Sequence, residues 1–248
     1  MLREEFKYGL IVSPTLERSI RAYPSRLQPY AGGDSFKPRI ENNILFSPYP
    51  PVEIPVCSIY TAVKRFLNQP GSKIAVVDCT QSLTRQALLR MIECHAGGFQ
   101  ELGIRPGDHV CVHLRNNVEN FVIVFGIIFA GATVILSNTT HKHHELLYRM
   151  DDGDATHIVT DSGCVRKVRD VCDVLKIPEK NRFVLGEASG FTSVAGFELL
   201  SRDAFVEVPR PDPRNTIAAI AYTAGTTGSS RGVEITHYSF VANLLQNQ

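Results

Sequence analysis

The residues best suited to chemistry lie in one loop near the carboxyl end of the printed chain, residues 222–232. Its three glycines let the backbone approach a ligand closely, and its hydroxyl and guanidinium groups add hydrogen-bond donors. Successive backbone N–H groups in such a loop can converge on an anion. We therefore expect a phosphate-binding loop, with the ligand held by Thr223, Ala224, Gly225, Thr226, Thr227, Gly228 and Arg231. Composition alone leaves open a flexible hairpin loop with incidental hydroxyl groups.

Two common phosphate-binding patterns do not fit this loop. The P-loop of nucleoside triphosphatases needs a lysine directly after its second glycine, and the loop contains no lysine. The dinucleotide-binding pattern Gly-x-Gly-x-x-Gly has a different glycine spacing. The apolar run 216–222 and the alternating residues 233–236 predict a strand on each side of the loop.

The whole string resembles the signature of adenylate-forming enzymes. This superfamily includes acyl-CoA synthetases, 4-coumarate-CoA ligases, insect luciferases and peptide-synthetase adenylation domains, and its pattern is Tyr-Thr-Ser-Gly-Thr-Thr-Gly-x-Pro-Lys-Gly-Val, then Thr-His and Ala-Asn. Three positions depart from it: Ala224 replaces serine, Ser230 replaces proline, and Arg231 replaces the lysine that contacts the phosphates. We expect the loss of proline to make the loop more flexible. The matching residues are Tyr222, Thr223, Gly225, Thr226, Thr227, Gly228, Gly232, Val233, Thr236, His237, Ala242 and Asn243.

The resemblance implies an ATP-dependent ligase. In the family, a carboxylic acid attacks the α-phosphate of ATP in the presence of Mg²⁺, and the acyl-adenylate then passes its acyl group to a thiol, usually coenzyme A. The resemblance runs from about residue 45 to 248 and covers only the amino-terminal part of the family's fold. We therefore expect a fragment of an acyl- or aryl-CoA synthetase, inactive on its own and without an assigned catalytic residue. The alternatives are a truncated, inactive paralogue that acts as a nucleotide-binding or interaction module, and a nucleotide-independent structural protein.

The rest of the chain alternates apolar strands with amphipathic helices. This order predicts an α/β fold with a mainly parallel sheet flanked by helices, which the resemblance assigns to the family's large domain. We expect residues 1–43 to form an extended or poorly ordered leader, and residues 44–248 a partial AMP-binding domain. The expected helices cover 58–68, 84–102 and 165–175, and another is capped by Thr139 or Thr140. The expected strands cover 73–78, 109–114, 156–160 and 182–185, with a linker at 186–196.

The run 121–136 contains sixteen residues without a charge. A membrane span is the alternative to a buried helix here, but a span needs roughly 20 apolar residues. We expect a helix that ends near Gly131, followed by a strand at 132–136. His95 lies on the apolar face of the helix 84–102, and we expect it to be a core residue.

Composition narrows the remaining classes of function. The net charge of +1 and the 44% hydrophobic content are typical of a globular protein and favour no nucleic-acid partner. Six scattered cysteines indicate reduced thiols, and the histidines 141, 143 and 144 do not share a helix face, so we expect no metal site. Glu4 and Glu5 do not fit a secretory signal. Arginines near the start are compatible with a mitochondrial presequence, but the acidic residues favour a cytoplasmic or peroxisomal protein.

Overall fold

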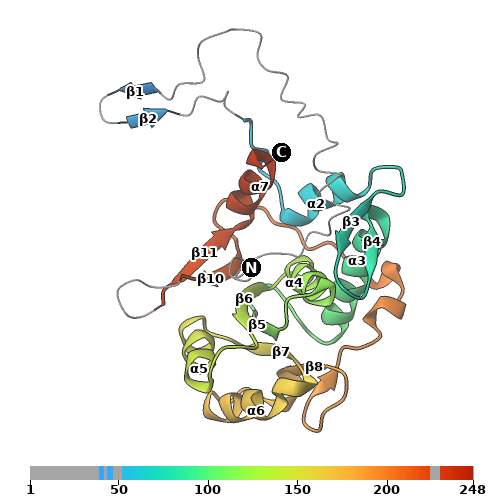
Figure 1. Ribbon diagram of the computed structural model, residues 1–248, viewed down its shortest axis with the longest axis vertical. Coiled ribbons are helices and arrows are strands. Elements are labelled where there is room, and N and C mark those ends of the chain that lie inside the picture. Colours follow the sequence, from blue (N-terminus) through green and yellow to red (C-terminus); the bar gives the residue numbers. More distant parts are fainter. Residues whose placement is uncertain (1–38, 42–43, 47–51, 224–229, 248) are drawn as a thin grey trace, which may run out of the picture.

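A seven-stranded sheet forms the centre of the protein in the computed structural model, which describes residues 39–41, 44–46, 52–223 and 230–247 (Figure 1). The strand order is β11–β10–β6–β5–β7–β8–β9. Neighbouring strands from β10 to β9 run parallel, and only the β10–β11 pair of this sheet is antiparallel. The mainly parallel sheet expected from the sequence is confirmed. The strands are β5 (His109–Leu114), β6 (Thr133–Asn138), β7 (His157–Asp161), β8 (Arg182–Leu185), β9 (Thr192–Ser193), β10 (Ile217–Tyr222) and β11 (Gly232–Thr236).

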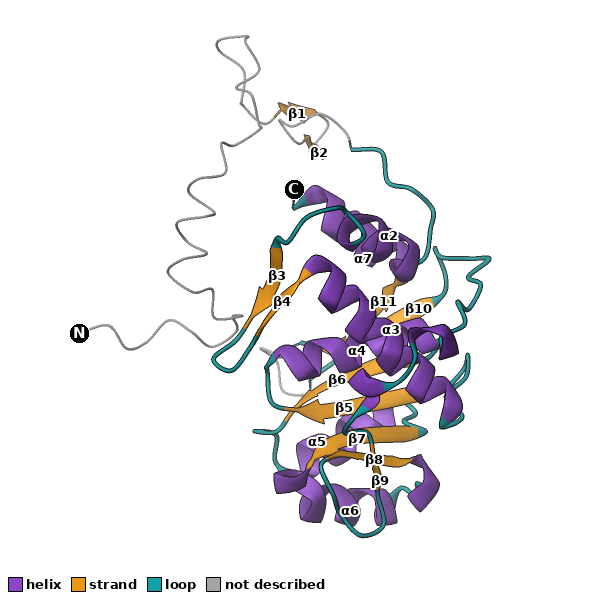
Figure 2. Cartoon of the chain, turned by 90° about the vertical axis from the view of Figure 1, so that its right-hand side faces the viewer, coloured by secondary structure: helices purple, strands orange, loops and turns teal. Residues whose placement is uncertain are grey.

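Helices cover both faces of the sheet, as Figure 2 shows. The larger hydrophobic core contains residues of α2 (Ile59–Leu67), α3 (Arg85–Glu101), α4 (Val118–Ala130) and α7 (His237–Gln246). The smaller core lies beneath α5 (His143–Asp152) and α6 (Val165–Val174). Successive side chains of β5 point to opposite faces of the sheet, so Val110 and Val112 belong to the larger core and Cys111 to the smaller.

Two small hairpins precede and flank this sheet. Strand β1 (Arg39–Glu41) pairs with β2 (Ile44–Phe46), and β3 (Ile74–Val77) pairs with β4 (Ser82–Thr84), both antiparallel. The strand expected at 73–78 is confirmed. Residues 1–38, 42 and 43 of the expected leader lie outside the described residues.

The uncharged run 121–136 forms a buried helix and a strand. Helix α4 ends at Ala130, because Gly131 adopts a left-handed φ of 118° that closes the helix, and β6 follows at Thr133. The helix begins before the run, where Asn117 accepts a hydrogen bond from Asn120 N at 2.9 Å. Within the described part of the chain, no helix is long and apolar enough to cross a membrane.

Helix α5 begins later than the sequence suggested. The prediction that Thr139 or Thr140 caps it was wrong, because the side chain of Asn138 accepts from Thr140 N at 2.9 Å and holds these residues in a turn. The helix instead starts after Lys142, whose N–H donates to the side chain of Glu145 at 2.6 Å. A second difference is β9, a two-residue strand inside the expected linker 186–196.

Candidate functional site

The predicted phosphate loop joins the two antiparallel strands β10 and β11. Tyr222 pairs with Gly232 at the end of the ladder. Beyond this pair, Thr223 N donates to Arg231 O at 3.1 Å, and Arg231 N donates to Thr223 Oγ1 at 3.4 Å. Thr223 and Arg231 therefore form the stem of the loop, and both residues are exposed. Ala224, Gly225, Thr226, Thr227 and Gly228, which the sequence also assigns to phosphate binding, lie outside the described residues.

The loop leaves the sheet at its carboxyl edge. Because β10 runs parallel to β6, the end of β10 at Tyr222 lies at the same edge as the ends of β5, β6, β7 and β8. Sheets of this class bind ligands beyond the carboxyl ends of their strands. The topology thus supports the position of the loop as a ligand site.

Ser230, which stands in place of the family's proline, makes a contact that proline could not make. Its hydroxyl donates to Thr223 O at 2.5 Å and so joins the two ends of the loop. The carbonyl of Ser230 in turn accepts from the hydroxyl of Tyr148 at 2.9 Å. Loss of the rigid proline ring is thus accompanied by one new hydrogen bond, from the Ser230 hydroxyl to Thr223 O.

Helix α5 supports the loop stem from the side. The hydroxyl of Tyr222 donates to Asp152 Oδ2 at 2.7 Å and lies 3.1 Å from Arg149 O. The guanidinium of Arg149 lies over the Tyr222 ring, 4.6 Å from its centre. Burial and the hydrogen bond to Asp152 raise the pKa of Tyr222, so its hydroxyl stays protonated and donates. Sequence reasoning missed these contacts because they join positions 70 or more residues apart.

A cavity of about 470 Å³ lies at the same carboxyl edge, beside β5, β7 and β8. Its apolar wall includes Leu114, Leu185 and Val194, and its polar rim includes Asn117 and the ion pair of Arg115 with Asp161, at 3.4 Å. No motif in the sequence indicated this cavity. Its walls come from segments that meet only in the folded sheet.

The histidines behave as structural groups. His95 is 4% exposed and its Nδ1 lies 2.8 Å from Met91 O, which confirms the expected core position. His143 and His144 lie exposed on the first turn of α5, whereas His141 precedes the helix and its Nδ1 contacts Ser137 Oγ at 3.1 Å. The residues that the structure describes contain no group of three or more metal-ligating side chains.

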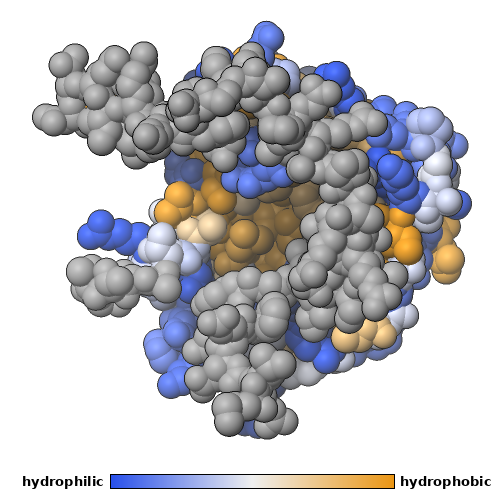
Figure 3. Space-filling view, turned by 45° about the horizontal axis from the view of Figure 1, so that its top comes forward, coloured by the Kyte–Doolittle hydropathy of each residue, from blue (hydrophilic) through white to orange (hydrophobic). Residues whose placement is uncertain are grey.

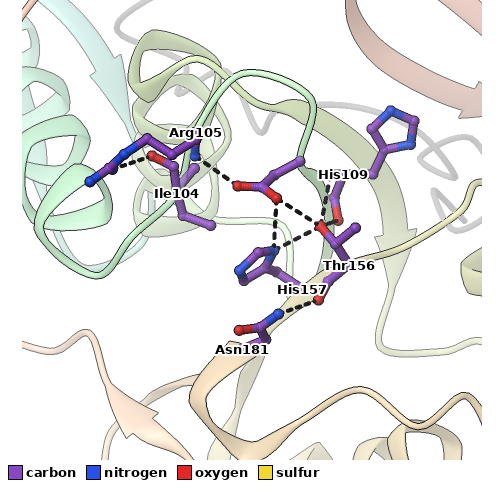
Figure 4. Close-up of polar contacts among 7 residues, drawn as sticks. Ile104, Arg105, His109, Thr156, His157 and Asn181 are labelled. Carbon is purple, nitrogen blue, oxygen red and sulfur yellow. Dashed lines mark hydrogen bonds and ion pairs between the residues drawn. The ribbon is translucent and has the colours of Figure 1, made fainter.

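A further polar cluster lies at the opposite, amino edge of the sheet (Figure 4). Asp108 accepts from Arg105 N at 2.7 Å, and its other oxygen lies 3.8 Å from Nδ1 of His157. Thr156 Oγ1 lies 2.8 Å from the same nitrogen and accepts from His109 N at 3.0 Å. These contacts fix the start of β5 against the start of β7. Burial lowers the pKa of His157.

Comparison with known proteins agrees with this fold. The family model of the AMP-binding enzymes matches residues 63–248. The chain is 27% identical over 212 residues to 4-coumarate–CoA ligase-like 6 of Arabidopsis thaliana, a match that covers 82% of this chain and 36% of the relative. It is also 27% identical over 165 residues to the long-chain-fatty-acid–CoA ligase of Bacillus subtilis, covering 57% and 30%.

Solved structures show the same arrangement. A long-chain-fatty-acid-CoA ligase (FadD1) from Archaeoglobus fulgidus superposes with a TM-score of 0.71 at 24% identity, covering 80% of this chain and 40% of that one. The apo structure of MbtA from Mycobacterium smegmatis gives 0.66 at 28% identity, covering 77% and 36%. The chain therefore belongs to the AMP-binding enzyme family. It spans between 30% and 40% of the length of these relatives.

Proposed function

We propose that this chain supplies the ATP-phosphate loop of an acyl- or aryl-CoA ligase, which activates a carboxylic acid as an acyl-adenylate and transfers it to coenzyme A. The observation that carries this proposal is the closed stem at Thr223 and Arg231, at the carboxyl edge of the sheet of an AMP-binding enzyme. Residues 44–248 would then correspond to the amino-terminal part of the large domain of such a ligase. The class of substrate is supported by the names of three relatives: a long-chain-fatty-acid–CoA ligase, a phenylacetyl-CoA ligase and a 4-coumarate–CoA ligase.

In this role the loop acts electrostatically. Backbone N–H groups and hydroxyls of 223–228, with the guanidinium of Arg231, would hold the β- and γ-phosphates and align pyrophosphate as the leaving group. A guanidinium offers a planar fork of donors, so it can bind two phosphate oxygens where the family's lysine offers a compact charge. Mg²⁺ would neutralise phosphate charge; we assign it no protein ligand, because the described residues contain no cluster suited to it.

Charge reversal at Arg231 tests this assignment. We expect ATP to bind the 248-residue chain more tightly than AMP, since only ATP carries the β- and γ-phosphates. Arg231→Glu should weaken ATP binding about 10- to 100-fold, the value of one or two charge-assisted hydrogen bonds, whereas Arg231→Lys should stay close to the parent chain. Isothermal titration calorimetry with ATP and AMP measures both effects.

The matched control is Arg90→Glu, which reverses an exposed charge on α3. It should leave ATP affinity unchanged. Equal affinities for ATP and AMP, or an Arg231→Glu chain that binds ATP like the parent, would contradict the phosphate-loop assignment.

The second candidate is a nucleotide-binding or interaction module without ligase activity. Ala224, Ser230 and Arg231, which depart from the family's signature, motivate it. Release of pyrophosphate from ATP, measured with a panel of aliphatic and aromatic acids and coenzyme A, tests this module. Acid-dependent release by the 248-residue chain would exclude it, whereas ATP binding without release is expected both of the module and of a ligase fragment that is inactive on its own.

A further inference from the structure

Tyr148 of helix α5 lies beside the base of the phosphate loop. Its hydroxyl is 2.9 Å from Ser230 O and 3.5 Å from Asp152 Oδ1. A phenol has one hydrogen to donate, and the shorter contact takes it. We infer that Tyr148 and Ser230 are positioning residues that hold Thr223 and Arg231, at the two ends of the loop, in place for the β- and γ-phosphates of ATP. This inference rests on the function proposed above.

The two ends of the loop are joined by side-chain as well as backbone contacts. Ser230 Oγ donates to Thr223 O at 2.5 Å, and Thr223 N donates to Arg231 O at 3.1 Å. The serine hydroxyl uses its single hydrogen in this bond, while the carbonyl of Ser230 accepts from Tyr148. The hydroxyl and the carbonyl of Ser230 therefore have different partners and different effects.

The carbonyl of Ser230 also determines the direction of the next N–H group. Both belong to one planar peptide unit, and in a trans peptide the C=O and the N–H point to opposite sides. With the carbonyl held toward α5 by Tyr148, the N–H of Arg231 points the other way and lies 3.4 Å from Thr223 Oγ1. Tyr148 thus orients the peptide unit from which the Arg231 side chain extends.

Helix α5, which carries Tyr148, is itself held against the sheet. Asp152, one helical turn further along α5, accepts from the Tyr222 hydroxyl at 2.7 Å. The rings of Tyr148 and Tyr222 meet edge to face, with centres 6.1 Å apart. Removal of the Tyr148 hydroxyl therefore releases the loop without detaching α5, because the ring contact and the Asp152 bond remain.

Such contacts act on affinity by fixing the described ends of the loop, Thr223 and Arg231, before the ligand arrives. Groups already held near their binding positions lose less conformational freedom on binding. One neutral hydrogen bond contributes about 0.5–1.5 kcal/mol, so each hydroxyl should change ATP affinity about 2- to 10-fold. The effect should be confined to ligands with β- and γ-phosphates.

Conservative substitutions test the inference in the 248-residue chain. We expect Tyr148→Phe and Ser230→Ala each to weaken ATP binding about 2- to 10-fold. Ser230→Thr keeps a hydroxyl and should retain the parent affinity. AMP affinity and the melting temperature should stay unchanged in all three variants. A combined Tyr148→Phe, Ser230→Ala chain should lose less than the product of the single effects, since both bonds hold the same end of the loop at Ser230.

The matched control is Tyr238→Phe in α7, where the ring lies against Arg214, 4.1 Å from its guanidinium carbon, at the far edge of the sheet. It should bind ATP like the parent. If Arg231→Glu weakens ATP binding but Tyr148→Phe and Ser230→Ala do not, the positioning role is wrong and the phosphate loop stands. Equal losses of ATP and AMP affinity, or losses that follow the melting temperature, would also overturn the positioning role. If the parent chain does not prefer ATP to AMP, the proposed function itself fails.

Discussion

At the scale of single residues, His237 joins two helices that lie far apart in the sequence. Its Nδ1 accepts from Ile59 N at 3.1 Å, and the side chain is buried. Burial and the nearby charge of Arg210 lower the pKa of His237 from 6.5 to about 4. The acceptor at Nδ1 exists only while that nitrogen carries no proton, so the contact requires a neutral ring.

This depressed pKa predicts a loss of stability in acid. The unfolded chain takes up the proton near pH 6.5, whereas the folded chain does so only near pH 4. The contribution of His237 is therefore complete above pH 6.5, falls as the pH drops, and levels off below about 4. His237→Gln keeps an acceptor but cannot titrate. We expect it to remove about 2 kcal/mol of the decrease in unfolding free energy between pH 7 and pH 5, measured by urea denaturation.

The readout is the slope against pH, because glutamine also changes packing and shifts the absolute stability. His113 should add a parallel contribution, since burial lowers its pKa to about 3, and it is present in both chains. An unchanged slope in His237→Gln would show that His237 titrates alike in the folded and unfolded states.

The sequence predicted which residue types form the candidate site, but not the contacts that hold them in place. The sequence itself shows one loop that contains glycines, hydroxyl residues and one cationic residue. It also shows the resemblance of this loop to the family's signature. The partners of Ser230 and Tyr222 are not visible, because Tyr148 and Asp152 reach them across 82 and 70 residues. Such pairings depend on the order of strands in the sheet, which local patterns do not determine.

At the scale of elements, α3 and α4 pack at a distance that glycine allows. A Cβ at Gly126 of α4 would lie 2.9 Å from the Cβ of His95 in α3, closer than side chains approach. The Cβ of His95 is bonded directly to the backbone, so it can move away only if α3 moves. Gly126 therefore sets how closely the two helices pack.

We expect Gly126→Ala to destabilise the fold. Alanine favours a helix over glycine by about 1 kcal/mol, but overpacking costs about 1–3 kcal/mol, and the second effect should win. Guanidinium denaturation measures the change. Gln86→Ala, at an exposed position of α3, is the control and should stay within about 0.5 kcal/mol. A Gly126→Ala chain more stable than its parent would show that α3 adjusts freely.

Elements with local start and stop signals were the predictable ones. Ser58, the first residue of the expected helix 58–68, caps α2 by accepting from Thr61 N, and Gly131 ends α4 where the sequence predicted. The start of α5 was misplaced because Asn138 competes for the backbone of the segment that follows it. Strands β4 and β9 were missed because two or three residues carry no period, and their neighbours hold them in place.

At the scale of the whole molecule, apolar surface is exposed on one face of the described protein. Figure 3 shows hydrophobic residues gathered in a hollow on one face of the described protein. Monomeric proteins rarely leave large contiguous apolar patches in water. The apolar hollow in this view is therefore a surface prone to self-association.

We expect the 248-residue chain to associate as its concentration rises. Sedimentation velocity should show a weight-average coefficient that increases with protein concentration, and a mild detergent should reverse the increase. Added salt serves as the control, because it weakens charge contacts and does not weaken apolar ones. One monomeric boundary at every concentration would rule this out.

The contact between Ile59 and His237 also bears on the order of events during synthesis. It closes a span of 178 residues, and α7 is the last helix described along the chain. Ribosomes add about 5–20 residues per second, so α2 emerges roughly 10–35 s before its partner. During that interval α7 does not yet cover its side of α2, so that apolar surface lacks its native neighbour. A chaperone that shields short amphipathic helices would find this surface exposed.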